Sequence, residues 1–198
     1  MNIPLFVALI NQLIWIFPIF RNWNHQFSYY FLILALIEPI GDIFILTLHY
    51  PANSVYIISS FLLLYSIFKF RLLKKNKFLG FGSILIVVGL VSYFNTGQSS
   101  ISYFLMMLIH IVIFLIILKM FVVDLRNKNS INVFYLVLVL YESILVLKFL
   151  LVISFSISSL VFFYISTAFT CLVAVFFILY NEENSPKFKI KLNLEMPD

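Results

Sequence analysis

Five ionisable residues lie inside strongly apolar segments of this chain: Glu38, Asp42, His110, Glu142 and Lys148. Glu38 and Asp42 are four residues apart, so a helix would place both carboxyl groups on one face. An ionisable residue at the centre of a bilayer costs about 2.5–3.5 kcal/mol even on a lenient scale, and such residues usually pair with one another or serve a function. We therefore take these five as the candidate binding site for a proton, a lipid or a small polar molecule.

The depth of each candidate follows from its place in its segment, because a helix rises about 1.5 Å per residue. Glu38, His110 and Glu142 each fall near the middle of an apolar segment. Asp42 and Lys148 lie about 6–9 Å further along, in the same half of the layer. The sequence thus predicts one enclosed polar network, with Glu38, His110 and Glu142 in a midplane layer and the other two residues above it.

Acids outnumber bases in this layer, which bears on what it could bind. If all three carboxyl groups were ionised, Lys148 could offset one charge and a protonated His110 a second. Apolar surroundings disfavour the charged form of a carboxyl group, so we expect at least one acid to be neutral at pH 7. A purely structural role, with each acid bonded to nearby hydroxyls, explains any single residue better. Only the group as a whole favours a site.

The composition indicates that these residues sit in membrane helices. The chain is 63% hydrophobic and 11% charged, whereas a soluble domain is roughly 45–50% apolar and about 25% charged. An α-helix needs about 20 mostly apolar residues to cross a bilayer core of about 30 Å. Seven segments qualify, at approximately 3–20, 28–48, 53–70, 78–94, 100–121, 131–153 and 159–180. We expect an all-α integral membrane protein, a seven-helix bundle over residues 1–180, with a short cytoplasmic tail at 181–198.

The basic residues predict the orientation of this bundle. Twelve of the 13 Lys and Arg residues fall on one side of the membrane, Lys148 being the exception. The positive-inside rule makes that side cytoplasmic, so the N-terminus is expected outside and the C-terminus inside. Binding of anionic lipid headgroups is a second role for these loops. Tyr30, near the cytoplasmic start of its segment, is typical of an interfacial anchor. Nucleic-acid binding is not expected, because no soluble domain presents a basic face.

No resident cofactor or metal is expected. The single cysteine, Cys171, cannot form a disulfide within the chain. His25 and His49 lie at segment edges, far in depth from His110, which argues against a three-histidine metal site. The last segment contains no lysine that could hold retinal, although microbial rhodopsins share the seven-span layout. No Ser-His-Asp spacing or phosphate-binding loop is present either.

Short motifs in the first three segments resemble those of small seven-helix bacterial membrane proteins of unknown function. The first segment closes on the aromatic-proline sequence at 16–19, the second has Glu38 at its middle, and the third opens with Asn53-Ser54-Val55-Tyr56. This resemblance implies the bacterial inner (cytoplasmic) membrane and brings no activity with it.

A more remote similarity is to lysoplasmalogenase-type membrane hydrolases. Gly41-Asp42 matches their Gly-Asp, and Tyr141-Glu142-Ser143 stands where they have Ser-Asp-Ser. Leu62 replaces the histidine that precedes the position of Tyr65. The similarity implies hydrolysis of a lipid with Asp42 and Glu142 as the catalytic candidates.

Three functions fit these observations. The first is a non-enzymatic sensor or binding module in the lipid bilayer, which passes its state to a separate signalling or assembly partner or to a second copy in a homo-oligomer. The second is an intramembrane hydrolase, which requires Asp42 and Glu142 to converge on one water. The third is a small proton-coupled transporter, since segments 1–3 and 5–7 could form parallel repeats. We favour the first.

Overall fold

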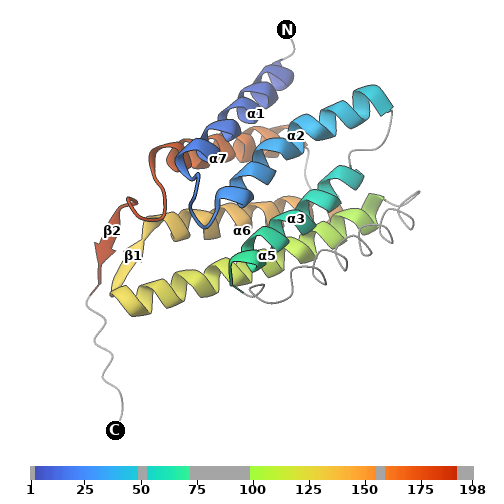
Figure 1. Ribbon diagram of the computed structural model, residues 1–198. Coiled ribbons are helices and arrows are strands. Elements are labelled where there is room, and N and C mark those ends of the chain that lie inside the picture. Colours follow the sequence, from blue (N-terminus) through green and yellow to red (C-terminus); the bar gives the residue numbers. More distant parts are fainter. Residues whose placement is uncertain (1–2, 49–52, 72–98, 155–158, 191–198) are drawn as a thin grey trace.

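The computed structural model describes residues 3–48, 53–71, 99–154 and 159–190 (Figure 1). Six helices occur in these ranges: α1 (Ile3–Arg21), α2 (Ser28–Leu48), α3 (Asn53–Arg71), α5 (Ser99–Lys128), α6 (Val133–Ser154) and α7 (Ser159–Leu179). Two short strands accompany them, β1 (Ser130–Asn132) and β2 (Lys187–Lys189). The predicted span at 78–94 and the end of the tail after 190 lie outside the described residues.

Three of the helices are long and apolar enough to cross a membrane, judged by length and composition. The qualifying stretches are Ser28–Thr47, Ile101–Lys128 and Val133–Ser154, and α1, α3 and α7 contain shorter apolar stretches. Large apolar side chains also cover the outer surface: Leu46 is 75% exposed and Leu172 is 70% exposed. Soluble proteins do not display apolar surface on this scale. The chain is therefore an all-α, membrane-embedded protein.

Helix α5 is longer than the apolar segment that predicts it, which ends near residue 121. It continues for about two more turns to Lys128, whose ammonium lies 2.6 Å from the carboxylate of Asp124. Such a pair at i and i+4 supports a helix, and basic residues in the last turn, here Arg126 and Lys128, interact favourably with its negative end. Polar residues thus carry α5 beyond its apolar part.

The described helices form a closed ring. Going round it, α1 packs against α2, α2 against α3, α3 against α5 and α5 against α6, while α7 closes the ring between α6 and α1 (Figure 1). The contact between α6 and α7 is the slightest of these. Side chains from all six helices can therefore point into one interior.

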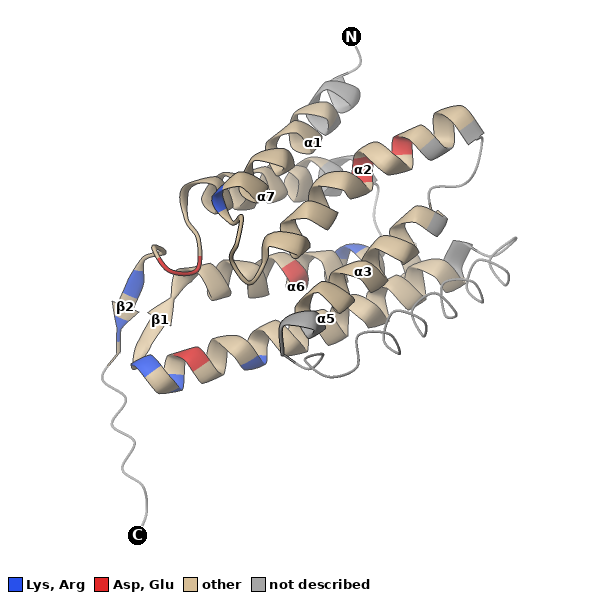
Figure 2. Ribbon diagram, in the orientation of Figure 1, with Lys and Arg blue, Asp and Glu red and all other residues tan. Residues whose placement is uncertain are grey.

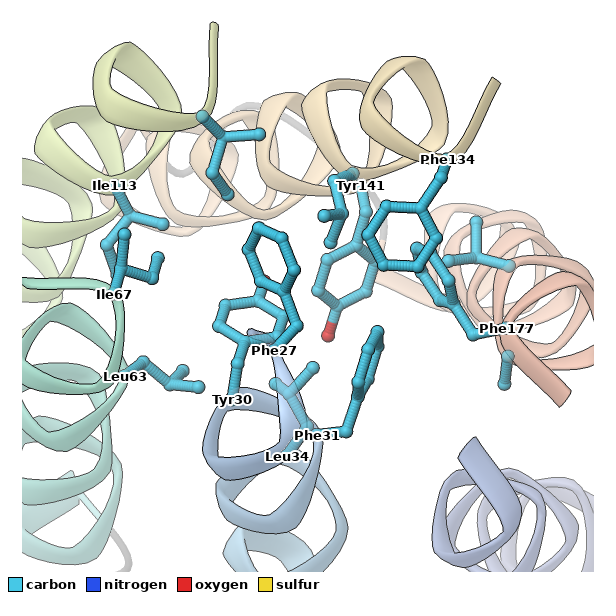
Figure 3. Packing of buried hydrophobic residues seen from close by; sticks show 14 of the residues in the cluster. Phe27, Tyr30, Phe31, Leu34, Leu63, Ile67, Ile113, Phe134, Tyr141 and Phe177 are labelled. Atoms are coloured by element: carbon cyan, nitrogen blue, oxygen red, sulfur yellow. The ribbon is translucent and has the colours of Figure 1, made fainter. Parts of the chain in front are cut away.

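An aromatic cluster fills that interior in the half of the bundle next to β1. Phe27 immediately before α2, Phe31 of α2, Phe134 of α6 and Phe177 of α7 are each at most 1% exposed. Their rings lie 4.8 Å apart for Phe31 and Phe177 and 5.5 Å for Phe27 and Phe134, at tilted angles (Figure 3). Offset and edge-to-face pairs of this kind are worth about 0.5–1.5 kcal/mol beyond the buried area. The cluster therefore sets how α2, α6 and α7 face one another.

The first part of the tail folds back onto the bundle. Strand β2 pairs antiparallel with β1, with Ile131 opposite Phe188. Asn129 precedes β1 with a φ of 47°, a left-handed conformation that asparagine tolerates better than most residues. Glu182 also accepts a hydrogen bond from the hydroxyl of Tyr135, and its backbone carbonyl accepts one from the amide of Asn132 at 3.0 Å. The polar composition of the tail alone did not indicate this anchoring.

Positive charge gathers in the half of the bundle that carries the two strands (Figure 2). Lys187 and Lys189 belong to β2, and Arg126 and Lys128 lie in the last turn of α5, just before β1. Lys148, in contrast, lies 15 residues after the start of α6, which follows directly on β1. The other basic side chains that the structure describes are Arg21, in the last turn of α1, and Lys119 of α5.

Candidate functional site

Helices α5 and α6 bring two of the predicted residues into direct contact. The Nδ1 atom of His110 lies 2.8 Å from Oε2 of Glu142, and these residues are 4% and 0% exposed. The hydroxyl of Tyr30, on α2, donates a hydrogen bond to Oε1 of Glu142. On the other side of the imidazole, Nε2 lies 3.3 Å from Oγ of Ser60, on α3. This buried chain of four side chains ties four helices together.

The hydrogen bonds of Ser60 indicate how many protons His110 and Glu142 hold between them. Its hydroxyl donates its only proton to the backbone carbonyl of Tyr56 at 2.8 Å, so it accepts from Nε2–H of His110. One proton then remains for the contact between Nδ1 and Oε2 of Glu142. The pair is either imidazolium with carboxylate or imidazole with carboxylic acid, and both forms are neutral overall. A neutral pair avoids the large cost of an uncompensated buried charge.

The prediction that Tyr30 is an interfacial anchor is wrong, because its side chain is buried. Tyr30 is 1% exposed and bonds to Glu142, whereas its position near a segment end predicted an interfacial anchor. Its neighbour Tyr29 is 52% exposed and points outward. Adjacent residues on a helix face different directions, so the rings of Tyr29 and Tyr30 cannot both point outward. The sequence therefore indicates that one of the two rings is buried, but not which one.

The other two acids lie in a different group. Glu38 accepts a hydrogen bond from the Tyr56 hydroxyl at 3.0 Å, and Asp42 accepts one from the side-chain amide of Gln12 at 2.8 Å. Among the described residues, no hydrogen bond or ion pair joins either acid to His110. The prediction of one enclosed network is therefore corrected to two groups.

The physical reason for this correction is that the helices do not begin at one level. Tyr30 lies two residues after the start of α2, yet it meets Glu142, nine residues after the start of α6. The offset of seven residues corresponds to roughly 10 Å of helix rise. Glu142 therefore sits closer than Glu38 to the end that carries the strands, although both are near the middle of their segments. Counting depth from segment ends could not detect this.

Glu38 instead lines a pocket of about 130 Å³ between α1, α2, α6 and α7. Lys148, which is exposed, lines the same pocket from α6. In the part of the chain that the structure describes, these two charged groups do not form an ion pair. Apolar walls come from residues that include Trp15 and Tyr141. The polar lining consists of Asn11, Gln12, Glu38, Lys148, Ser166, Thr167 and Thr170.

The described residues offer hydrogen-bonding groups rather than metal ligands. Within residues 3–48, 53–71, 99–154 and 159–190, no group of three or more His, Cys, Asp and Glu could hold a metal ion. The thiol of Cys171 and the hydroxyl of Thr170 both donate to Oδ1 of Asn11, at 3.4 Å and 3.1 Å. These bonds hold α1 against α7 at the wall of the pocket.

Comparisons of the chain with models of protein families, with curated proteins and with solved structures found no match in any of the three. The described geometry provides two features for a functional proposal. One is the buried Glu142–His110 pair, in which Nδ1 of His110 lies 2.8 Å from Oε2 of Glu142. The other is the pocket that Glu38 and Lys148 line.

Proposed function

We propose that this protein is a membrane-embedded binding module that holds a small polar molecule in the pocket between α1, α2, α6 and α7. The observation that supports the proposal most directly is that two oppositely charged side chains, Glu38 and Lys148, line one pocket among amide and hydroxyl groups. Ionisable residues at membrane depth usually face an interior cavity and mark ligand paths. Concave sites with a few convergent polar groups are the usual form of small-molecule sites.

The topology that we propose has seven spans, with the segment at 78–94 as the span outside the described residues. Support comes from the basic side chains gathered at the end of β1 and β2 (Figure 2), which the positive-inside rule makes cytoplasmic. The N-terminus is then outside, and the pocket lies in the outer half of the bilayer with Lys148. A bacterial inner membrane is the compartment that we propose, from the resemblance to small bacterial seven-helix proteins.

A route from pocket to bundle supports the role of a sensor. Tyr141 lines the pocket, and its ring centroid is 5.1 Å from that of Trp15 on α1. The next residue, Glu142, is bonded to Tyr30 of α2 and His110 of α5. A molecule that shifts Tyr141 therefore acts on the contacts between these helices. We propose that a separate signalling or assembly partner, or a second copy of the chain, reads this change.

The alternative of a lipid hydrolase receives less support from the contacts. It requires Asp42 and Glu142 to face one water. Both carboxylate oxygens of Glu142 are engaged, by Tyr30 and His110, and the residue is 0% exposed. Asp42 is bonded to Gln12. A proton-coupled transporter is favoured by one specific observation, the buried 2.8 Å contact between His110 and Glu142, two groups that can exchange a proton.

The proposal is tested by native mass spectrometry of the protein as purified in mild detergent. We expect a small polar molecule to remain bound to the wild-type chain and to be absent from Thr167→Leu, which fills the pocket from α7. Ala168→Leu adds a larger side chain at the next position, which faces outward, and should keep the bound molecule. Identical spectra for the wild type and Thr167→Leu would contradict the proposal.

A further inference from the structure

The charges that line the pocket indicate the class of molecule that it takes. Glu38 is positioned by the hydroxyl of Tyr56, which donates to its Oε2 atom at 3.0 Å. Lys148 approaches from α6, and among the described residues its ammonium forms no ion pair. Opposite charges attract strongly in surroundings of low dielectric constant. Two such groups that line one pocket without joining leave room for a molecule that contacts both.

We propose that the ligand is a compact zwitterion, whose ammonium lies against Glu38 and whose acidic group lies against Lys148. This inference rests on the proposed function, since it requires the pocket to bind a small molecule. The rings of Trp15 and Tyr141 also line the pocket. Aromatic faces attract cations, so they suit the ammonium end of the ligand.

The two opposite charges that line the pocket favour a ligand that carries charges of both signs. Glu38 and Lys148 are the acidic and basic side chains that line the pocket, and their charges sum to zero, whereas Asp42 does not line it and accepts a hydrogen bond from Gln12. A molecule with only one charged group would leave either Glu38 or Lys148 unpaired. Glu38 is half-buried, and a charge in such surroundings of reduced dielectric constant is more favourable when an opposite charge lies close to it. A zwitterion pairs both charges at once.

The size of the pocket limits the ligand further. Its volume is about 130 Å³, and a cavity of about 150 Å³ is known to hold benzene, a molecule with six heavy atoms. A small amino acid such as alanine has this size, and the phosphoethanolamine headgroup of a lipid is slightly larger. Both carry an ammonium and an acidic group, which is the chemistry that the pocket recognises.

The experiment measures the thermal unfolding midpoint of the full-length protein in detergent. Glycine, L-alanine and phosphoethanolamine are the zwitterionic probes, and ethylamine, propionate and inorganic phosphate are the single-charge controls. Nanodiscs of phosphatidylethanolamine and of phosphatidylglycerol form a second arm, which tells a lipid headgroup from a free molecule. We expect at least one zwitterion to raise the midpoint of the wild type. For Glu38→Gln and for Lys148→Gln, at least ten times more of that zwitterion should be needed to raise the midpoint by the same amount. For Lys119→Gln, at an exposed residue of α5 that does not line the pocket, the required concentration should stay the same.

Two results would overturn the inference. One is that a single-charge control stabilises the wild type as much as any zwitterion, in which case the pocket binds a small molecule of another class and the proposed function stands. The other is that no zwitterion and no phosphatidylethanolamine bilayer stabilises the wild type. If Thr167→Leu then also leaves the mass spectrum of the purified protein unchanged, the proposed function fails as well.

Discussion

Replacing Glu142 by glutamine should lower the free energy of unfolding only slightly, whereas replacing it by leucine should lower it much more. In Glu142→Gln, the amide oxygen can accept the bond from Tyr30, and the amide nitrogen can donate to Nδ1 of a neutral His110. The imidazole keeps its Nε2–H for Ser60, at the 3.3 Å contact. Every hydrogen bond is retained and only the shared proton is lost. We expect a loss of about 1 kcal/mol in the free energy of unfolding, the scale of one hydrogen bond.

Leucine is close in size but has no polar atoms. Glu142→Leu leaves the Tyr30 hydroxyl and the Nδ1 atom of His110 without a partner, at residues that are 1% and 4% exposed. Each unsatisfied buried group costs about 1–3 kcal/mol, so the loss should be about 2–6 kcal/mol. Breaking a buried charge pair by removing one partner costs a similar amount, about 3–5 kcal/mol.

The measurement is reversible unfolding in mixed micelles, followed by circular dichroism, for both variants and for the double variant Glu142→Leu/His110→Phe. Residues in direct contact are not additive, and replacing both partners by apolar groups removes an unpaired nitrogen. The double variant should therefore lose less than the sum of its single variants. Equal losses for glutamine and leucine, together with an additive double variant, would refute the shared-proton pair.

Three further predictions concern packing, tail and topology. Ile117 is 0% exposed, so Ile117→Ala should lower the free energy of unfolding by about 2–5 kcal/mol in the same assay. Leu115, on the same helix, is 54% exposed. Leu115→Ala should therefore cost less than about 1 kcal/mol, because no interior cavity forms. Tyr135→Phe removes the hydrogen bond to the carboxylate of Glu182. It should lower the free energy of unfolding by about 1 kcal/mol and speed tryptic cleavage at Lys187. Unchanged cleavage would show that this bond does not hold the tail. In spheroplasts of a cysteine-free background, a membrane-impermeant maleimide should label Ser154→Cys at once and Lys187→Cys only after permeabilisation, and the reverse pattern would invert the orientation.

The membrane class and most helix ends could be predicted from the sequence, because they depend on local properties. Helices α1, α2, α3 and α7 begin and end within one residue of the apolar segments that predict them. In a bilayer, a helix satisfies its backbone hydrogen bonds within its own segment, so apolar length alone indicates where it lies. The exceptions are polar: the last turns of α5 and the strand β1, whose pairing partner β2 is more than 50 residues away.

The importance of the ionisable residues could also be predicted, but not their grouping. Composition singles out Glu38, His110 and Glu142, because each stands in an apolar segment. Which of them meet depends on the rotation of each helix about its axis and on its offset along the axis. A shift of two residues turns a helix by more than half of a turn, since one turn takes 3.6 residues. No local pattern reports either quantity.

By itself, then, the sequence determined that this chain is a helical membrane protein with acids and bases at depth. Only the tertiary structure decided that Glu142 pairs with His110 while Glu38 shares a pocket with Lys148. Packing of the aromatic cluster at the strand end and pairing of β1 with β2 join residues far apart in the chain. These long-range contacts set the offset between α2 and α6, and that offset separates two carboxyl groups that segment counting places at the same depth.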